Sequence, residues 1–192
     1  MPLIYFVRHG QTDYNAAKRI QGALEIPINA NGREQGLRNG GLLAELIAEK
    51  GRFDFVASPF LRARQTMEIV RRAMGLPTEG YRVDDRLREI SFGEWAGSTW
   101  AEVEARDPER YARRQADRWN VAAPGGDCYR EVYQRVAEWL ESVTTDTVAV
   151  GHYGTARCIR GYIQKLPINE VLDLDAPQDK VLMIEGQTLT WL

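Results

Sequence analysis

The stretch LIYFVRHGQTDYN, residues 3–15, decides the fold. Its first part, Leu3–Val7, is a short apolar run without helical spacing, which is typical of a strand buried in a parallel sheet. Arg8, His9 and Gly10 follow this run without a spacer. Open α/β sheets bind their ligands at the carboxyl ends of the strands, so we expect a functional site that contains this guanidinium and this imidazole.

Two further apolar segments stop in the same abrupt way. Residues 53–57 are followed by a Ser-Pro turn and a helical segment that contains Arg62, and residues 147–151 are followed by His152. The chain has two histidines, and both come directly after an apolar run, an arrangement that random placement would seldom produce. Strands that alternate with helical segments predict an α/β fold with functional residues at the strand ends.

Four motifs and one loop resemble those of the histidine phosphatase superfamily, the phosphoglycerate-mutase-like proteins. The signature Arg-His-Gly-x-Thr-x-x-Asn is complete in residues 8–15, and Ser-Pro-x-x-Arg-Ala-x-Gln-Thr is complete in residues 58–66. Residues 87–97 resemble the segment that carries the family's acid, and residues 152–157 resemble its second histidine motif. Residues 21–28 look like the family's loop beside the phosphate pocket. The resemblance extends over nearly the whole chain.

The resemblance implies a three-layer α/β/α sandwich with a mostly parallel central sheet. A chain of 192 residues is long enough for one good core and short for two. We therefore expect a single domain over residues 1–192, with a helical cap segment at about residues 99–125. The resemblance is to the small phosphatase branch, the alpha-ribazole phosphatase and broad-specificity phosphatase type. It implies hydrolysis of a phosphomonoester through a phosphohistidine, with no metal and no cofactor.

The resemblance also implies a role for each candidate site residue. His9 would accept the phosphoryl group, and Glu89 would donate a proton to the leaving oxygen and then activate water. Arg8, Arg62 and His152 would hold the phosphate oxygens. The further candidates at the pocket are Asn15, Gln21, Gly22 and Tyr153.

The chain departs from the family's motifs at several positions. Tyr153 replaces the first glycine of His-Gly-Gly, and this phenol would either narrow the pocket or offer a hydrogen-bond donor. Asp127 and Cys128 stand where the family favours Glu and Ser, and Ala96 replaces a Glu outside the expected acid position. Contacts from the corner at residues 127–128 are therefore not carried over from the family.

A charged, helical segment follows Thr99, and its sequence contains a group of arginines. They are Arg106, Arg110, Arg113, Arg114 and Arg118. Either they form a solvated face, as charges on a helix usually do, or one or two of them reach a second anionic group of the substrate. The sequence leaves both alternatives open.

Composition argues against several other classes of function. A net charge of −2 argues against bulk binding to nucleic acid, and no apolar run approaches the roughly 18 residues of a membrane span. Met1 leads into the first strand without a targeting segment, so we expect a cytoplasmic protein. Cys128 and Cys158 form no metal-ligand spacing. The expected partner is a small phosphorylated metabolite, and the oligomeric state stays open, with a homodimer as one alternative.

Three functions fit these residues: a phosphatase, a phosphoglycerate-type mutase, and a family member that binds phospho-ligands without turnover. The complete set of catalytic candidates argues against binding alone, because a binding module has no need of a proton donor. Glu89 is followed by Ile90-Ser-Phe-Gly93, as in the family's small phosphatases. The resemblance therefore favours the phosphatase.

The sequence also predicts the residue ranges of several helices and strands. Asn31 is a suitable N-cap for a helix that runs to about Lys50. The predicted apolar side of this helix consists of Leu37, Leu43, Leu46 and Ile47. A strand is expected within residues 81–87, a helix over residues 129–142, and a hairpin within residues 181–192.

Overall fold

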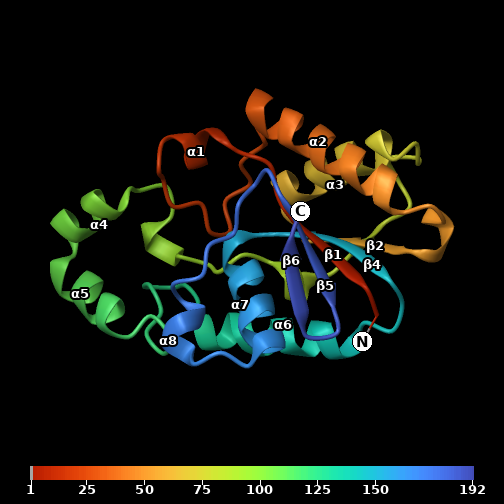
Figure 1. The fold of residues 1–192 in the computed structure, drawn as a ribbon. Coiled ribbons are helices and arrows are strands. Elements are labelled where there is room, and N and C mark those ends of the chain that lie inside the picture. Colours follow the sequence, from red (N-terminus) through yellow and green to blue (C-terminus); the bar gives the residue numbers. More distant parts are fainter. Residues whose placement is uncertain (1) are drawn as a thin grey trace.

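The computed structural model describes residues 2–192 and is built around one sheet (Figure 1). Its strands are β1 (Ile4–Arg8), β2 (Asp54–Ala57), β3 (Arg82–Val83), β4 (Thr147–Gly151), β5 (Val181–Glu185) and β6 (Thr188–Trp191). The strand order is β3-β2-β4-β1-β5-β6. The first four strands in this order pair in parallel, whereas β5 runs antiparallel to both β1 and β6.

Helices cover both faces of this sheet. They are α1 (Asp13–Ala16), α2 (Ala30–Leu46), α3 (Leu61–Ala73), α4 (Trp100–Arg106), α5 (Pro108–Ala116), α6 (Tyr129–Ser142), α7 (Tyr153–Gln164) and α8 (Ile168–Val171). In Figure 1, α2 and α3 lie over one face and α6 and α7 over the other. This arrangement confirms the predicted three-layer α/β/α sandwich with a mostly parallel sheet. Within residues 2–192, no helix has both the length and the apolar character needed to cross a membrane.

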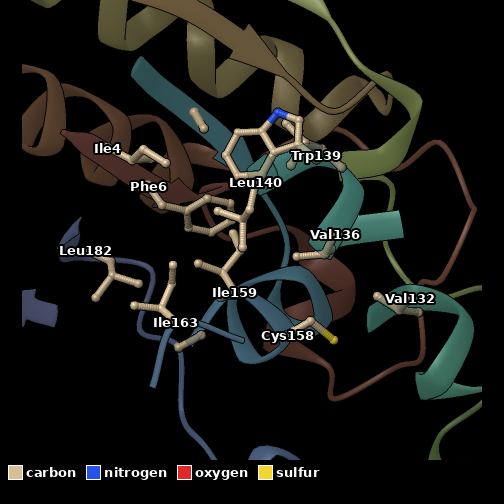
Figure 2. Packing of buried hydrophobic residues seen from close by; sticks show 14 of the residues in the cluster. Ile4, Phe6, Val132, Val136, Trp139, Leu140, Cys158, Ile159, Ile163 and Leu182 are labelled. Carbon is tan, nitrogen blue, oxygen red and sulfur yellow. The ribbon is translucent and has the colours of Figure 1, made fainter. Parts of the chain in front are cut away.

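Each face of the sheet builds its own core because side chains alternate along a strand. From β1, Ile4 and Phe6 join a cluster with α6 and α7, whereas Tyr5 and Val7 join a cluster with α2 and α3. Figure 2 shows the first cluster, in which Trp139 of α6 is fully buried. Burial of each such side chain stabilises the fold by about 1.5–3 kcal/mol. Both cores therefore hold β1, and with it the residues at its end.

The N-cap predicted for the first long helix was wrong. Asn29 is the N-cap of α2, and its side chain accepts a hydrogen bond from the backbone N–H of Gly32 at 2.9 Å. Asn29 has the extended conformation that capping requires, whereas Asn31 already lies inside the helix. α2 also ends at Leu46 rather than near Lys50.

The predicted apolar side of α2 is correct only in part, because the helix packs on α3 through a glycine. Leu43 is fully buried, but Leu37 and Leu46 are 51% and 45% exposed. A Cβ added at Gly40 would lie 2.7 Å from the Cβ of Ala73 in α3. The missing side chain lets the two helices approach closely. The pattern of large apolar residues does not predict such a contact.

The strand expected within residues 81–87 is shorter than predicted. Only Arg82–Val83 pairs with β2, at the edge of the sheet. Asp84 then accepts a hydrogen bond at 3.0 Å from the backbone of the 3-10 turn Asp85–Leu87, which it caps. This local capping ends the strand. The predicted helix Tyr129–Ser142 and the C-terminal hairpin of β5 and β6 are confirmed.

Candidate active site

Three neighbouring strands end at the same edge of the sheet and bring predicted site residues together. β1 ends at Arg8 and is followed by His9, β4 is followed by His152, and β2 is followed by Ser58. β1 and β4 pair in register, with Arg8 opposite Gly151. The rings of His9 and His152 therefore lie next to each other, with their centroids 5.1 Å apart.

His9 is held as a neutral imidazole. Its Nδ1 lies 2.8 Å from the carbonyl oxygen of Gly10, and because a carbonyl only accepts hydrogen bonds, Nδ1 carries the proton. In the neutral ring, Nε2 then keeps its lone pair. The pKa of His9 lies well below 6.5, first because the ring is buried and then because Arg62 and Arg8 disfavour a positive charge. Such an imidazole is suited to nucleophilic attack.

His152 is fully buried and is fixed by Ser58. Its Nε2 lies 2.7 Å from the hydroxyl of Ser58, which itself accepts a hydrogen bond from the N–H of Phe60 at 3.4 Å. Nδ1 is buried and has no hydrogen-bond partner among residues 2–192. Burial, followed by Arg62 and His9, lowers the pKa of His152 well below 6.5. A hydroxyl can donate or accept. If Ser58 donates to Nε2, the neutral ring has its proton on Nδ1, and if Ser58 accepts, the proton is on Nε2.

Arg8 and Arg62 bring two guanidinium groups to the site. Arg62 is 1% exposed and donates hydrogen bonds to the carbonyl oxygens of Leu24 and Gly22 at 2.8 and 2.7 Å. Arg8 donates to the carbonyl oxygen of Ala176 at 2.7 Å. Burial lowers the pKa of Arg62 to about 10, so the group is still a cation at neutral pH. Gly22 therefore acts through its backbone, by orienting Arg62.

Glu89 reaches the site beside a glycine that the sequence analysis did not single out. The carboxylate accepts hydrogen bonds from the backbone N–H groups of Gly154 and Ile90, both at 3.0 Å. A Cβ at Gly154 would collide with Oε1 of Glu89. The charge of Glu89 opposes the effect of burial on the pKa of both Arg8 and Arg62. The second glycine of the His-Gly-Gly motif is the signal that could have identified Gly154.

The amides of Asn15 and Gln21 are both held by Thr12. Its backbone N–H donates to Oδ1 of Asn15 at 3.1 Å, and its hydroxyl donates to Oε1 of Gln21 at 2.9 Å. Gln178 also donates to Oδ1 of Asn15, at 3.2 Å, and to the carbonyl oxygen of His9 at 2.9 Å. Because both amide oxygens are occupied, the amide N–H groups can serve a ligand. Gln178 belongs to no motif, and only the fold brings it to His9.

These side chains surround a cavity of about 460 Å³, a volume in the usual range for small-molecule sites. All predicted site residues except His152 line it. They are Arg8, His9, Asn15, Gln21, Gly22, Arg62, Glu89 and Tyr153. His152 completes the set from a buried position next to His9.

The cavity is strongly cationic. Among residues 2–192, Glu89 is the one carboxylate in its lining. The cations in the lining are Arg8, Lys18, Arg19, Arg62, Arg114, Arg118 and Arg157. Arg114 and Arg118 belong to the segment that follows Thr99, so that segment is not a purely solvated face. In the part of the chain that the structure describes, no group of three or more His, Cys, Asp or Glu side chains could hold a metal ion.

Tyr153 lies between two of these cations. The guanidinium carbons of Arg8 and Arg157 lie 4.8 and 4.2 Å from the centroid of its ring. The Tyr153 hydroxyl accepts a hydrogen bond from Nη2 of Arg157 at 2.7 Å. Tyr153 lines the cavity, and its hydroxyl still has a hydrogen to donate, so both alternatives from the sequence stay open.

Residues 4–191, nearly the whole chain, match the model of the histidine phosphatase superfamily (branch 1). The chain belongs to this superfamily. A glucosyl-3-phosphoglycerate phosphatase of Mycolicibacterium vanbaalenii is 34% identical, over 80% of this chain and 65% of the relative. A bifunctional protein of Mycobacterium tuberculosis is 32% identical over 90% of this chain, which spans 44% of that relative. A probable phosphoglycerate mutase of Serratia proteamaculans is 27% identical, over 98% of this chain and 87% of the relative.

Solved structures of proteins named as phosphatases have the same fold. The alpha-ribazole phosphatase of Shigella flexneri has a TM-score of 0.82, over 99% of this chain and 94% of that chain, and at 20% identity it shows the fold alone. A mycobacterial glucosyl-3-phosphoglycerate phosphatase, solved in complex with VO3, has a TM-score of 0.78 at 27% identity, over 100% of this chain and 97% of that chain. These neighbours match the small phosphatase branch of the histidine phosphatase superfamily.

The departure from the superfamily's motif at Asp127 and Cys128 lies outside the cavity lining. Asp127 accepts a hydrogen bond from the backbone N–H of Ser91 at 3.0 Å and lies 3.6 Å from the guanidinium of Arg135. Arg135 in turn donates to the carbonyl oxygen of Glu89 at 3.1 Å. Cys128 is a buried free thiol at the N-cap of α6. This corner therefore supports the backbone on both sides of the acid.

Proposed function

We propose that this protein is a phosphomonoester hydrolase that acts on a small phosphorylated metabolite through a phosphohistidine, without a metal or other cofactor. The observation that carries the proposal is the state of His9. Its buried, neutral ring keeps the lone pair of Nε2 beside Arg8 and Arg62, on the wall of a cationic cavity. Relatives named as phosphatases support the same class of reaction.

In the first half-reaction the cationic site takes up the phosphate dianion. Arg8 and Arg62 balance the charge on the phosphate oxygens, and His152, beside His9, donates a hydrogen bond to one of them. Nε2 of His9 attacks phosphorus in line with the leaving oxygen, so that a P–N bond forms and the P–O ester bond breaks. Glu89, in its protonated form, gives its proton to the departing oxygen, and the alcohol leaves neutral.

In the second half-reaction the same carboxyl group works as a base. Glu89, now ionised, takes a proton from a water molecule, and the water oxygen attacks phosphorus. The P–N bond breaks, the electron pair returns to Nε2 of His9, and inorganic phosphate leaves. The backbone N–H groups of Gly154 and Ile90 hold the Glu89 carboxylate, which fixes the position of the carboxyl group.

We also propose that residues 1–192 form one domain in which residues 99–125 act as a cap. α4 and α5 lie apart from the three layers, on the left of Figure 1. Trp100, Arg114 and Arg118 from this segment line the cavity. The cap would thus select the metabolite, while the strand ends perform the chemistry.

A second candidate is a phosphoglycerate-type mutase, because one relative is named as a probable phosphoglycerate mutase. A mutase has to protect its phosphoenzyme from water while the substrate turns over in the site. After Glu89 this chain has Ile90-Ser-Phe-Gly93, as in the family's small phosphatases, where the mutases carry Glu-Arg-His-Tyr-Gly. We therefore favour hydrolysis.

Two assays test the proposal. The protein should release p-nitrophenol from p-nitrophenyl phosphate at a rate that prolonged chelation leaves unchanged, because side chains of the protein hold the phosphate. A rate restored only by an added divalent ion would contradict the mechanism. Incubation with 3-phosphoglycerate and a trace of 2,3-bisphosphoglycerate distinguishes the two enzymes, since rapid formation of 2-phosphoglycerate with little inorganic phosphate would identify a mutase.

A further inference from the structure

Arg114 on α5 has a buried guanidinium that lacks a counter-ion among residues 2–192. The residue is 2% exposed, and among residues 2–192 its Nε and Nη2 have no hydrogen-bond partner. Other arginines of the same segment are paired: Arg110 lies 3.6 Å from Asp107, and Arg118 lies 3.1 Å from Asp173. Buried arginines are normally paired, so the isolation of Arg114 requires an explanation.

Two aromatic rings hold this guanidinium at the cavity wall. Its central carbon lies 5.0 Å from the ring centroid of Phe92 and 5.5 Å from that of Trp100. The two rings meet edge to face, and both line the cavity together with Arg114. Aromatic contacts of this kind fix the plane of a guanidinium without neutralising its charge. The orientation of Arg114 is therefore set before any ligand arrives.

The surroundings of Arg114 leave its charge unbalanced. Burial is the main cause that lowers its pKa, Tyr129 acts in the opposite direction, and the neighbouring cation Arg118 lowers the pKa again. No carboxylate is among the groups that act on it. A buried charge without a counter-ion destabilises a protein. An anion that enters the cavity would supply the missing negative charge.

The phosphate that reacts with His9 does not need Arg114. Arg8 lies at the end of β1 and Arg62 on α3, next to the histidine, whereas Arg114 comes from α5. All of these residues line one cavity, which has room for more than a phosphoryl group. A ligand that contacts both residues would place its reacting phosphoryl group at His9 and another of its groups at Arg114.

On the basis of the proposed phosphatase function, we propose that Arg114 binds a second anionic group of the substrate, either a carboxylate or a second phosphoryl group. The planar fork of a guanidinium matches the oxygen pairs of both groups. The natural substrate is then a phosphate ester with an anionic group at each end. The competing explanation is that Arg114 only packs the cap against Phe92 and Trp100, in which case a second anion gains no affinity.

Calorimetric titration of a His9→Ala variant tests the proposal without turnover. Glycerol 3-phosphate is the singly anionic probe, 3-phosphoglycerate adds a carboxylate, and glycerol 1,3-bisphosphate adds a second phosphate. Glucose 6-phosphate and 6-phosphogluconate repeat the carboxylate comparison over a longer span. At least one doubly anionic probe should bind about 10- to 100-fold more tightly than its matched partner, the gain of one charge-assisted contact. The carboxylate and bisphosphate arms show which anion is preferred.

Arg114→Gln, added to this variant, should remove the preference for the second anion, and Arg113→Gln should leave it unchanged. Arg113 is exposed on the same helix and does not line the cavity, so the control removes an equal charge. Arg114→Lys, which keeps the charge without the planar fork, should retain only part of the preference. If Arg114→Gln unfolds at the assay temperature, Arg114→Lys is used in its place.

Equal affinity for singly and doubly anionic probes of both lengths would overturn the proposal, and so would a preference that persists in Arg114→Gln. Either result leaves the phosphatase function standing, provided that the wild-type protein turns over p-nitrophenyl phosphate. Failure of every phosphate ester to bind and of the wild type to turn over would instead contradict the function on which the inference rests.

Discussion

Two adjacent buried imidazoles, those of His9 and His152, have different hydrogen-bond partners. The carbonyl of Gly10 holds the proton of His9 on Nδ1, which leaves the lone pair of Nε2 for phosphorus. The hydroxyl of Ser58 contacts Nε2 of His152 instead, and among residues 2–192 Nδ1 of this ring has no hydrogen-bond partner. The roles proposed for the two rings, nucleophile and phosphate donor, therefore rest on different surroundings, and burial disfavours a positive charge on both.

The variant Glu89→Gln should distinguish a role of Glu89 as proton donor from a purely structural role. An amide cannot protonate the leaving oxygen, so the rate with alkyl phosphates such as glycerol 3-phosphate should fall by about 10²–10⁴-fold. The rate with p-nitrophenyl phosphate should fall much less, because its phenolate leaves without a proton. The exposed Glu94, which does not line the cavity, provides the control Glu94→Gln. An equal loss on both substrates would point to a structural role for Glu89.

At the scale of elements, the strand ends were predictable and the helix contacts were not. An apolar run that stops at Arg8 or His152 is a local signal, and the sheet only has to align the strands to bring these residues together. The prediction of the N-cap of α2 was wrong because Asn29 and Asn31 are the same residue type and are equally suitable caps. Only the backbone conformation distinguishes them. The contact at Gly40 was missed because it depends on the absence of a side chain.

Adjacent glycines in α2 allow a test of this close contact. Gly40→Ala should destabilise the protein by about 1–3 kcal/mol, because the new methyl group overlaps Ala73 and the backbone of Val70. Gly41→Ala meets nothing within 4 Å and should be neutral or stabilising by up to about 1 kcal/mol. Urea denaturation of both variants measures the difference, and equal stabilities would show that α2 and α3 do not approach as described.

At the scale of the whole molecule, sequence motifs predicted which residues come together better than they predicted the rest of the cavity wall. The signature residues come together as their motifs indicated: all but His152 line one cavity, and His152 lies beside His9. Gln178 could not be assigned in this way because it belongs to no motif, and the sequence could not single out Arg114 among the five arginines of its segment. The composition of the cavity wall therefore depends on residues from distant parts of the chain.

The two buried histidines should make the stability of the whole protein sensitive to mild acid. Folding lowers the pKa of both His9 and His152 well below 6.5. As the pH falls through the ordinary histidine pKa, the unfolded chain therefore takes up protons that the native protein does not, and stability is lost. The free energy of unfolding should fall by about 2 kcal/mol between a pH of about 7 and about 5.5.

Urea denaturation at several pH values measures this slope. The chain has no other histidine, so a His152→Gln variant should lose about half of the pH dependence in this window. A free energy of unfolding that stays constant as the pH falls would mean that both rings take up protons in the folded protein. That result would contradict the neutral state assigned to His9.

The most direct test of the central claim is to locate the phosphoryl group during turnover. Protein quenched in alkali while it hydrolyses p-nitrophenyl phosphate should yield a peptide with a phosphoryl group on His9, stable in base and lost in acid. His9→Ala should lack both this modification and the activity. A fully active His9→Ala variant, or a phosphoryl group carried by another residue, would contradict the account.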